Sequence, residues 1–485
     1  MASKVAKQPL VVPTDTVVPL SQFDNPMPLQ RMFIYSTFLF DHVLNVSMLR
    51  NGLEALIERD GWRKLGARLR RNPRTGNLEH HIPVRFTEQR PAIKFHHAKY
   101  DMARARHPVA SKLPSTTPHL PAVMADPNDF ESLWFHPDAP AKLGDHLNRD
   151  EPQLCLVVAS FDDATLVSLS WPHSLCDALG LGELLRAWSL MIRGQHHEVP
   201  KPFGDRHDPL AELGLHPTEP YKLEGSQLSW LGLFIYYLRT WLKIVLDKPR
   251  SRMIYVPGPY IRCLREKVVR ELSDESRSVR EEFVSEGDVL SAWWAKINVA
   301  HLSGNRSNKL FHLINALGWR PTLSEDLLLA HRPYISNAVG LGSVLIPAKA
   351  IAAKPLSYVA RQIRQCIVES RQREQIEAYA ALWRKSPGKI PPLFGNATMH
   401  VITCSNWSKA DLLGLDFSAA LTAHATTSST VTEPGRPCYV QSCFRGVQLS
   451  DFLAILGRDC RGGYWLTGIT SEKHWAIIEE AMTKI

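Results

Sequence analysis

Three histidines in the chain are each followed, four positions later, by an aspartate, and such a pair can support acid–base chemistry. The pairs are His97 and Asp101, His146 and Asp150, and His173 and Asp177. An imidazole with an unperturbed pKa of about 6.5 can accept a proton from a hydroxyl or an amine at neutral pH. In a chain with 20 histidines, about one such spacing is expected by chance. The spacing alone therefore does not identify a site.

Sequence context distinguishes His173 from the other two. The apolar runs 154–161 and 164–171 flank a short acidic turn, which predicts a β-hairpin. From Leu181 to Ile192 apolar residues recur every three or four positions, which predicts an amphipathic helix that Gly194 closes. His173 thus lies where a strand ends and a helix begins, a junction that holds a side chain rigidly. These residues alone leave two interpretations open, a catalytic base and a hydrogen-bonded structural histidine.

The rest of the chain mixes helical and strand-like patterns. We predict helices at 51–69, 289–299, 356–371 and 475–482, and strands at 252–256, 311–317, 400–404, 437–444 and 463–467. The proline-dense segment 107–140 is predicted to be an ordered loop. Because strands and helices do not alternate strictly, the pattern favours the α+β class over a doubly wound sheet.

A length of 485 residues predicts two domains. A polar stretch with several prolines, 195–222, looks like the exit from the first domain. We therefore predict an N-terminal lobe over 1–215, a crossover segment over 216–250 and a C-terminal lobe over 251–485.

The crossover contains an apolar run, 228–246, that has almost the length of a membrane span. Arg239 and Lys243 lie inside it, and each costs about 2.5–3.5 kcal/mol at a bilayer centre. We predict a helix that is buried or lines a groove. An interfacial contact and a true span are the alternatives.

Composition excludes several classes of protein. The 57 Lys and Arg against 48 Asp and Glu give a net charge of +9, which suits an anionic ligand. The basic residues are scattered and no zinc-finger or RNA-binding motif appears, so nucleic acid is not an expected partner. Phosphate-loop, hydrolase-elbow and zincin motifs are absent from the sequence, and no histidines have metal-ligand spacing. We expect no bound metal.

Cysteine usage and the N-terminus bear on the compartment. The eight cysteines are widely spread with no Cys-x-x-Cys pair, which predicts reduced thiols. The N-terminus has no apolar signal region. We expect a cytoplasmic protein without a transmembrane segment.

The stretch 170–180, SWPHSLCDALG, resembles the catalytic strand–loop–helix of the HxxxD (BAHD-type) acyltransferases. Other segments resemble motifs of that family and follow in its order: Leu65–Leu69, Arg320–Leu323, Tyr334–Asn337 and Leu415–Ser418. The segments Gly435–Gln441 and Gly462–Leu466 resemble fungal members such as trichothecene O-acetyltransferases. The likeness extends over nearly the whole chain.

This resemblance implies a two-domain fold like that of chloramphenicol acetyltransferase, with a channel between the domains. Acyl-CoA, most simply acetyl-CoA, enters from one face as co-substrate, and a small hydrophobic acceptor enters from the other. His173 acts as the general base on the acceptor hydroxyl. Asp177 is structural and pairs with an arginine, and Asp416 is expected to form a structural ion pair with Arg320. A monomer is expected.

The sequence also departs from the family pattern. Ala178 replaces a usual glycine, and Asp416-Phe417 continues as Ser-Ala-Ala instead of Gly-Trp-Gly, which leaves the donor to the oxyanion unassigned. Thr403, Ser405 and Trp407 are candidates because they lie just upstream and can donate hydrogen bonds. Strand-end packing and turn hydrogen bonds are the alternative role for these three.

We therefore predict an acyl-CoA-dependent O-acyltransferase acting on a hydrophobic secondary metabolite. One alternative is acyl transfer from a carrier-protein thioester, or amide formation as in a condensation domain. Pro172 disfavours the latter, because those domains usually have a second histidine at this position. The other alternative is a catalytically degenerate binding protein with the same fold.

Overall fold

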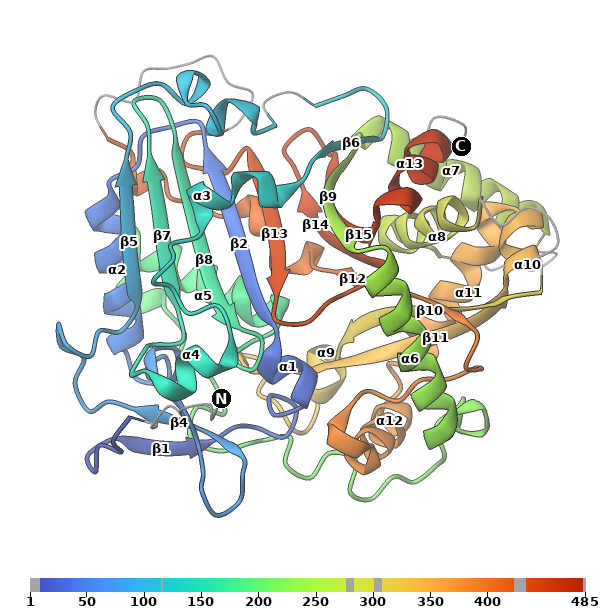
Figure 1. The fold of residues 1–485 in the computed structure, drawn as a ribbon, viewed down its shortest axis with the longest axis horizontal. Coiled ribbons are helices and arrows are strands. Elements are labelled where there is room, and N and C mark those ends of the chain that lie inside the picture. Colours follow the sequence, from blue (N-terminus) through green and yellow to red (C-terminus); the bar gives the residue numbers. More distant parts are fainter. Residues whose placement is uncertain (1–8, 115–116, 276–282, 301–307, 423–432, 483–485) are drawn as a thin grey trace.

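The computed structural model describes residues 9–114, 117–275, 283–300, 308–422 and 433–482. Two large sheets stand side by side (Figure 1). The first has the strand order β13 (Tyr439–Arg445), β2 (Phe33–Phe40), β8 (Thr165–Pro172), β7 (Cys155–Ser160) and β5 (Lys94–Lys99). Helices α2 (Val46–Glu58) and α5 (Ala178–Ile192) pack on each other behind it (Figure 1).

The second sheet combines strands from distant parts of the chain. Its order is β11 (Val339–Pro347), β10 (Leu310–Gly318), β12 (His400–Asn406), β14 (Phe452–Arg458), β15 (Tyr464–Ser471), β9 (Pro249–Val256) and β6 (Ala122–Ala125). A small third sheet joins β1 (Thr16–Pro19), β4 (Leu78–Ile82) and β3 (Arg68–Arg71). Mixed pairing within the second sheet, parallel for β10–β12–β14 and antiparallel elsewhere, agrees with the α+β class.

The two large sheets exchange strands. β13 lies in the second half of the chain but pairs with β2 in the first sheet, and β6 lies in the first half but pairs with β9 in the second sheet. Each sheet therefore contains one strand from the other half of the sequence. This exchange ties the two halves together around the region where β8 and β12 end.

The remaining helices cover the outer faces. They are α1 (Met27–Arg31), α3 (Glu131–Trp134), α4 (Leu143–Asn148), α6 (Trp230–Leu246), α7 (Gly258–Glu275), α8 (Glu286–Val299), α9 (Arg320–Leu323), α10 (Ala348–Ala353), α11 (Leu356–Glu369), α12 (Arg373–Lys385) and α13 (Glu472–Met482). Helices α7, α8 and α11 pack against one another, with α8 buried along most of its length. Figure 1 shows this group at the side of the second sheet.

The hairpin and helix predicted around His173 are confirmed as β7, β8 and α5. The helix predicted over 51–69 is wrong in extent. α2 ends at Glu58, and Gly61 follows with φ +83°, a left-handed conformation that interrupts the helix. Strands β2 and β14 were not predicted; both are buried on both faces and show no alternation of polar and apolar residues.

We expected 228–246 to form a helix that is buried or lines a groove. The helix is confirmed as α6, but its burial is wrong, because none of its 17 residues is buried. Among the described residues, no helix combines the length and the apolar character needed to cross a bilayer.

Candidate active site

His173 lies immediately after β8, at the edge of the first sheet. Its backbone N–H donates to the carbonyl of Met32, at 2.8 Å, which continues the pairing of β8 with β2 by one residue. The carbonyl of Pro172 then accepts from Leu175, closing a tight turn before α5 begins. The sheet therefore fixes the backbone of His173 on one side, and the helix fixes it on the other.

Asp177 caps α5 and also holds it to the second sheet. Its Oδ1 accepts from the backbone N–H of Gly180 at 2.8 Å, and its Oδ2 accepts from the N–H of Ala338 at 3.0 Å. The guanidinium of Arg320 donates to both oxygens, at 2.8 and 2.9 Å. Four hydrogen bonds thus hold this buried carboxylate, and none of them comes from His173. Asp177 positions the turn rather than the imidazole ring.

The expected pairing of Asp416 with Arg320 is wrong. Arg320 is bound to Asp177 and to the carbonyls of Tyr334 and Ser336. Asp416 instead lies 3.6 Å from Arg193, just beyond the last turn of α5, and its Oδ1 accepts from the N–H of Ser418. The family resemblance implied that both aspartates form structural ion pairs. In the fold, Asp177 pairs with Arg320 and Asp416 pairs with Arg193.

A buried polar network holds the backbone carbonyl of His173. The side chain of Asn337 donates to the carbonyl of His173 at 2.8 Å and to Asp24 at 2.7 Å. Asp24 is completely buried and lies 3.7 Å from the ammonium of Lys64. Burial raises the pKa of Asp24, and Lys64 and Asn337 oppose that shift. The network joins three distant segments of the chain next to the turn that carries His173.

The surroundings of His173 favour a neutral imidazole. Burial lowers its pKa below the ordinary value of 6.5, because a charged ring loses hydration there. At neutral pH the ring is therefore free to accept a proton. The neighbouring thiol of Cys176 is fully buried and burial raises its pKa well above the usual range, so it is a packing group rather than a nucleophile.

His173 opens into a cavity of about 310 Å³ that is largely apolar. Its walls include Leu29, Met32, Leu341, Trp383, Phe444 and Phe452. Thr403, Ser405 and Trp407, the predicted oxyanion candidates, line the same cavity as His173. We call this space the His173 cavity.

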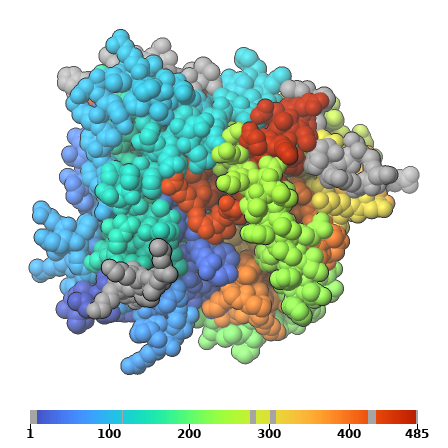
Figure 2. Space-filling view, viewed as in Figure 1, coloured from blue at the N-terminus to red at the C-terminus, as the bar shows by residue number. Residues whose placement is uncertain are grey.

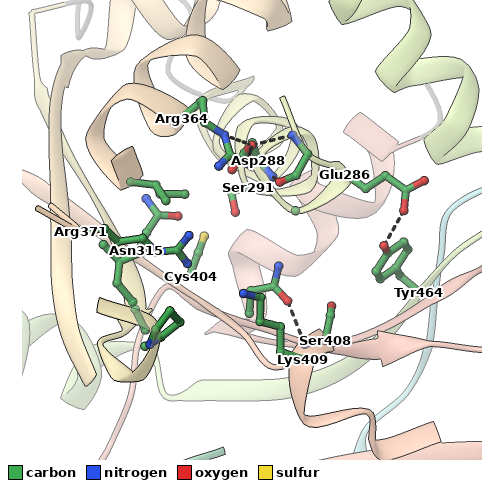
Figure 3. Close-up of a pocket in the computed structure, with 18 of the residues that line it drawn as sticks. Glu286, Asp288, Ser291, Asn315, Arg364, Arg371, Cys404, Ser408, Lys409 and Tyr464 are labelled. Atoms are coloured by element: carbon green, nitrogen blue, oxygen red, sulfur yellow. Dashed lines mark hydrogen bonds and ion pairs between the residues drawn. The ribbon is translucent and has the colours of Figure 1, made fainter. Parts of the chain in front are cut away.

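A second cavity of about 670 Å³ lies next to it and is more polar. The two cavities share four wall residues: Leu179, Ala316, Gly318 and Asn406. Figure 3 shows the second space bordered by side chains of α8, α11, β12 and the segment after β12. We call it the basic cavity, because Arg265, Arg364, Arg371, Lys409 and Arg458 line it.

The ends of β10 and β12 separate the two cavities. Asn315 and Cys404 are register partners and line the basic cavity, whereas Thr403 and Ser405, on either side of Cys404, line the His173 cavity. Successive side chains of a strand point to opposite faces. Because the side chains of β12 alternate between its two faces, β12 and its neighbour β10 contribute side chains to the walls of both cavities.

The cations of the basic cavity differ in how they are held. Arg364 is paired with the buried carboxylate of Asp288, which also caps α8 (Figure 3). Lys409 and Arg458 are exposed, and Arg458 lies 3.8 Å from the carboxylate of Glu286, which also lines the cavity. Burial lowers the pKa of Arg371, and its Nε has no hydrogen-bond partner among the described residues. The cavity therefore presents positive charge and an unsatisfied guanidinium donor to an anionic ligand.

Ser405 and Trp407 are coupled. The indole N–H of Trp407 donates to the hydroxyl oxygen of Ser405 at 2.9 Å. The indole is therefore occupied, whereas the Ser405 hydroxyl keeps its own hydrogen to donate. Of the two, Ser405 is the group that can donate to a ligand in the cavity.

Sequence reasoning missed Asp24 and Lys64, and it gave Asn337 no specific role. No local signal marks Asp24 or Lys64, which lie far from the His173 motif in sequence and meet Asn337 only in the folded chain. Across the described residues, no group of three or more His, Cys, Asp or Glu side chains is arranged to hold a metal ion.

The comparisons with known proteins extend along the full length of the chain. It is 36% identical over 99% of its length to acetyltransferase adrJ of Penicillium rubens, covering 97% of that protein. It is 37% identical over 99% of its length to a Penicillium decumbens protein named transcriptional regulator calD, covering 98% of it. No family model matches the chain.

A solved structure has the same fold. The crystal structure of Fusarium sporotrichioides TRI101 with coenzyme A and T-2 aligns with a TM-score of 0.68 over 97% of this chain and 98% of that one, at 17% identity. This likeness confirms the two-domain, chloramphenicol-acetyltransferase-like fold. With the full-length acetyltransferase relative, it leads to one assignment: the chain belongs to the BAHD-type acyltransferase family.

Proposed function

We propose that the chain transfers an acyl group from acyl-CoA to a hydroxyl of a small hydrophobic secondary metabolite, with His173 as the general base. The observation that carries the proposal is the contact between the two cavities. A cavity that holds a neutral histidine and apolar walls shares four wall residues with a cavity lined by five cations and two carboxylates, Glu286 and Asp288. A thioester carbonyl can reach His173 across that shared wall while the phosphates of its carrier stay among the cations.

The two cavities suit the two substrates. The basic cavity takes the CoA, with Arg371, Lys409 and Arg458 available for its phosphates. The His173 cavity takes the acceptor, because its aromatic and aliphatic walls exclude water and favour an apolar molecule. Acetyl-CoA is the proposed donor. Acetyltransferase adrJ, the relative from Penicillium rubens, supports an acetyl group.

In the proposed reaction each transferred proton has a named donor and acceptor. His173 accepts the proton of the acceptor hydroxyl as the oxygen attacks the thioester carbonyl. The hydroxyl of Ser405 donates a hydrogen bond to the oxyanion that develops. The tetrahedral intermediate collapses, the carbon–sulfur bond breaks, and the imidazolium returns its proton to the departing CoA thiolate. Asp177, Arg320 and Asn337 hold the turn that carries the base.

Release of free thiol from acetyl-CoA in the presence of hydrophobic alcohols tests the proposal. His173→Ala should remain folded by circular dichroism yet lose acyl transfer. His97→Ala is the matched control, since His97 has the same spacing to an aspartate but is exposed on β5. Unchanged turnover in His173→Ala, or equal loss in both variants, would contradict the assignment of the base.

A binding protein of the same fold is the second candidate function. The relative named transcriptional regulator calD and the altered Asp-Phe-Ser segment favour it. Calorimetric titration with CoA and acyl-CoA separates the two functions. Binding without thiol release from any donor and acceptor class would favour the binding protein, whereas release that depends on His173 would exclude it.

A further inference from the structure

Helix α6 presents an unusually apolar surface to solvent. Ten of its apolar side chains are exposed: Trp230, Leu231, Phe234, Ile235, Tyr237, Leu238, Trp241, Leu242, Val245 and Leu246. Trp230 is 79% exposed, Phe234 60% and Trp241 58%. In Figure 2 this segment lies uncovered on the face turned toward the viewer. Soluble surfaces rarely expose a contiguous patch of this kind without a binding partner.

These side chains form one face of the helix. At 3.6 residues per turn these side chains span about half of the helix circumference, with Phe234, Leu238 and Val245 near the middle of that arc and Trp230, Tyr237 and Trp241 toward one edge. On the opposite side, Leu233 and Tyr236 pack on a cluster of Leu228, Ile314, Leu393 and Met399. The exposed face therefore does not take part in the packing that holds α6 to the second sheet.

The charges of α6 are all basic. The helix contains Arg239 and Lys243 and no acidic residue. Lys243 turns inward and pairs with Asp451 at 2.6 Å. Arg239 is exposed at the edge of the apolar face, and within the described part of the chain it forms no ion pair.

The region just beyond the helix has charges of both signs. Lys248 and Arg250 are exposed there, in a hollow with Asp129 and Asp247, and Arg252 pairs with both Asp126 and Glu472.

We propose that α6 docks on the surface of a lipid bilayer, lying in the interfacial plane with its apolar face inserted. Its 17 residues extend about 26 Å. Its Trp and Tyr side chains are of the types that prefer the headgroup boundary. The apolar face supplies most of the binding, and the exposed guanidinium of Arg239 can pair with a lipid phosphate.

A second copy of the chain fits this surface less well. In a two-fold contact the same face meets itself, so Arg239 of both copies would border one interface without a carboxylate on α6 to pair with it. Lipid phosphates supply that negative charge instead.

Docking through α6 would hold the His173 cavity beside the lipid. Leu341, which packs on the same cluster as Leu233 and Tyr236 of α6, also lines that cavity, as does Ser450, next to the partner of Lys243. An acceptor dissolved in the bilayer would then have a short route to the cavity, a consequence that rests on the proposed function. Lipid binding itself is measured without turnover, so its failure and a failure of the proposed activity are distinguishable.

Vesicle co-sedimentation tests the docking. The full chain should sediment with vesicles of phosphatidylcholine and phosphatidylserine, and also with vesicles of phosphatidylcholine alone. The triple variant Trp230→Gln, Phe234→Gln, Trp241→Gln should lose about tenfold or more in partition coefficient, because three exposed insertion side chains are removed. Its melting temperature should not change, since these side chains make little internal contact.

A matched control removes exposed apolar residues elsewhere. Val84→Gln with Leu120→Gln alters side chains that are 60% and 65% exposed outside α6, and it should bind vesicles like the unaltered chain. Absence of vesicle binding, or equal binding by the triple variant, would overturn the proposal. So would a lipid-free dimer, detected by analytical ultracentrifugation, that the triple variant abolishes, because the occupant would then be a second copy.

Discussion

Arg320 holds both carboxylate oxygens of Asp177, at 2.8 and 2.9 Å, across 143 residues of sequence. The pair links the start of α5, directly after the turn that carries His173, to α9 at the end of β10. Asp177 is only 2% exposed, so the pair is shielded from solvent. Its geometry places a structural ion pair next to His173 without any contact to the imidazole.

Removing the charge of Asp177 should destabilise the fold. Asp177→Asn leaves Arg320 buried without its counter-charge, and we expect the free energy of unfolding to fall by about 3–5 kcal/mol. Asp416→Asn is the matched control, because Asp416 and Arg193 are 27% and 38% exposed and such pairs contribute less than about 1 kcal/mol. Urea unfolding of both variants measures the difference. Equal losses in the free energy of unfolding would show that the Asp177–Arg320 pair stabilises the fold no more than the Asp416–Arg193 pair does.

The activity should persist to mildly acidic pH. Burial lowers the pKa of His173 below 6.5, so the neutral ring that accepts the proton remains the main form at pH values where a solvated histidine is half protonated. The acid limb of kcat/KM against pH should therefore have its midpoint below 6.5. A midpoint above that value would mean that the group titrating is not His173 in this environment.

Ser405 should contribute to the transition state more than to binding. Ser405→Ala removes the proposed oxyanion donor, and we expect kcat to fall by about 100-fold or more with a small change in KM. Trp407→Phe removes only the indole N–H that donates to Ser405, so it should retain most activity. Steady-state kinetics of both variants test this, and a reversed order of effects would assign the donor to Trp407.

Arg371 should act on the nucleotide part of the donor. Arg371→Gln removes an incompletely satisfied guanidinium from the basic cavity and should raise KM for acetyl-CoA by about tenfold. Turnover of acetyl-pantetheine, which lacks the nucleotide, should be unaffected. Arg186 is an exposed arginine paired with Glu183 on α5, and Arg186→Gln should change the KM for neither donor. Equal effects on acetyl-CoA and acetyl-pantetheine would contradict the proposed contact between Arg371 and the nucleotide of CoA.

Acid should destabilise the protein partly through His312 on β10. This residue is fully buried, neither ring nitrogen has a hydrogen-bond partner among the described residues, and burial lowers its pKa to about 3. The unfolded chain, with an ordinary pKa of about 6.5, binds the proton first, so stability is present above pH 6.5 and is lost as the pH falls.

At pH 5 the loss from His312 alone is about 2 kcal/mol. His312→Leu should reduce the difference in unfolding free energy between pH 7 and pH 5 by about that amount. An unchanged difference would show that His312 does not titrate with unfolding.

The sequence alone determined the fold class and the local setting of His173. Continuous apolar runs and three-to-four periodicities are local properties of the chain, so β7, β8, α5 and the turn carrying His173 follow directly from them. Thr403, Ser405 and Trp407 could also be selected, because their side chains can donate and they lie near a strand end. Their presence in one cavity with His173 confirms a shared location, while their roles stay predictions.

Only the tertiary structure decided which distant groups meet. The partner of Arg320 is Asp177 and not Asp416, because the end of β10 lies against the start of α5 and Asp416 lies beside its last turn. The network of Asp24, Lys64 and Asn337 depends on three segments that no sequence period relates. The exposure of α6 likewise could not be read from its composition, since an apolar run has the same letters whether its face meets the core or the solvent.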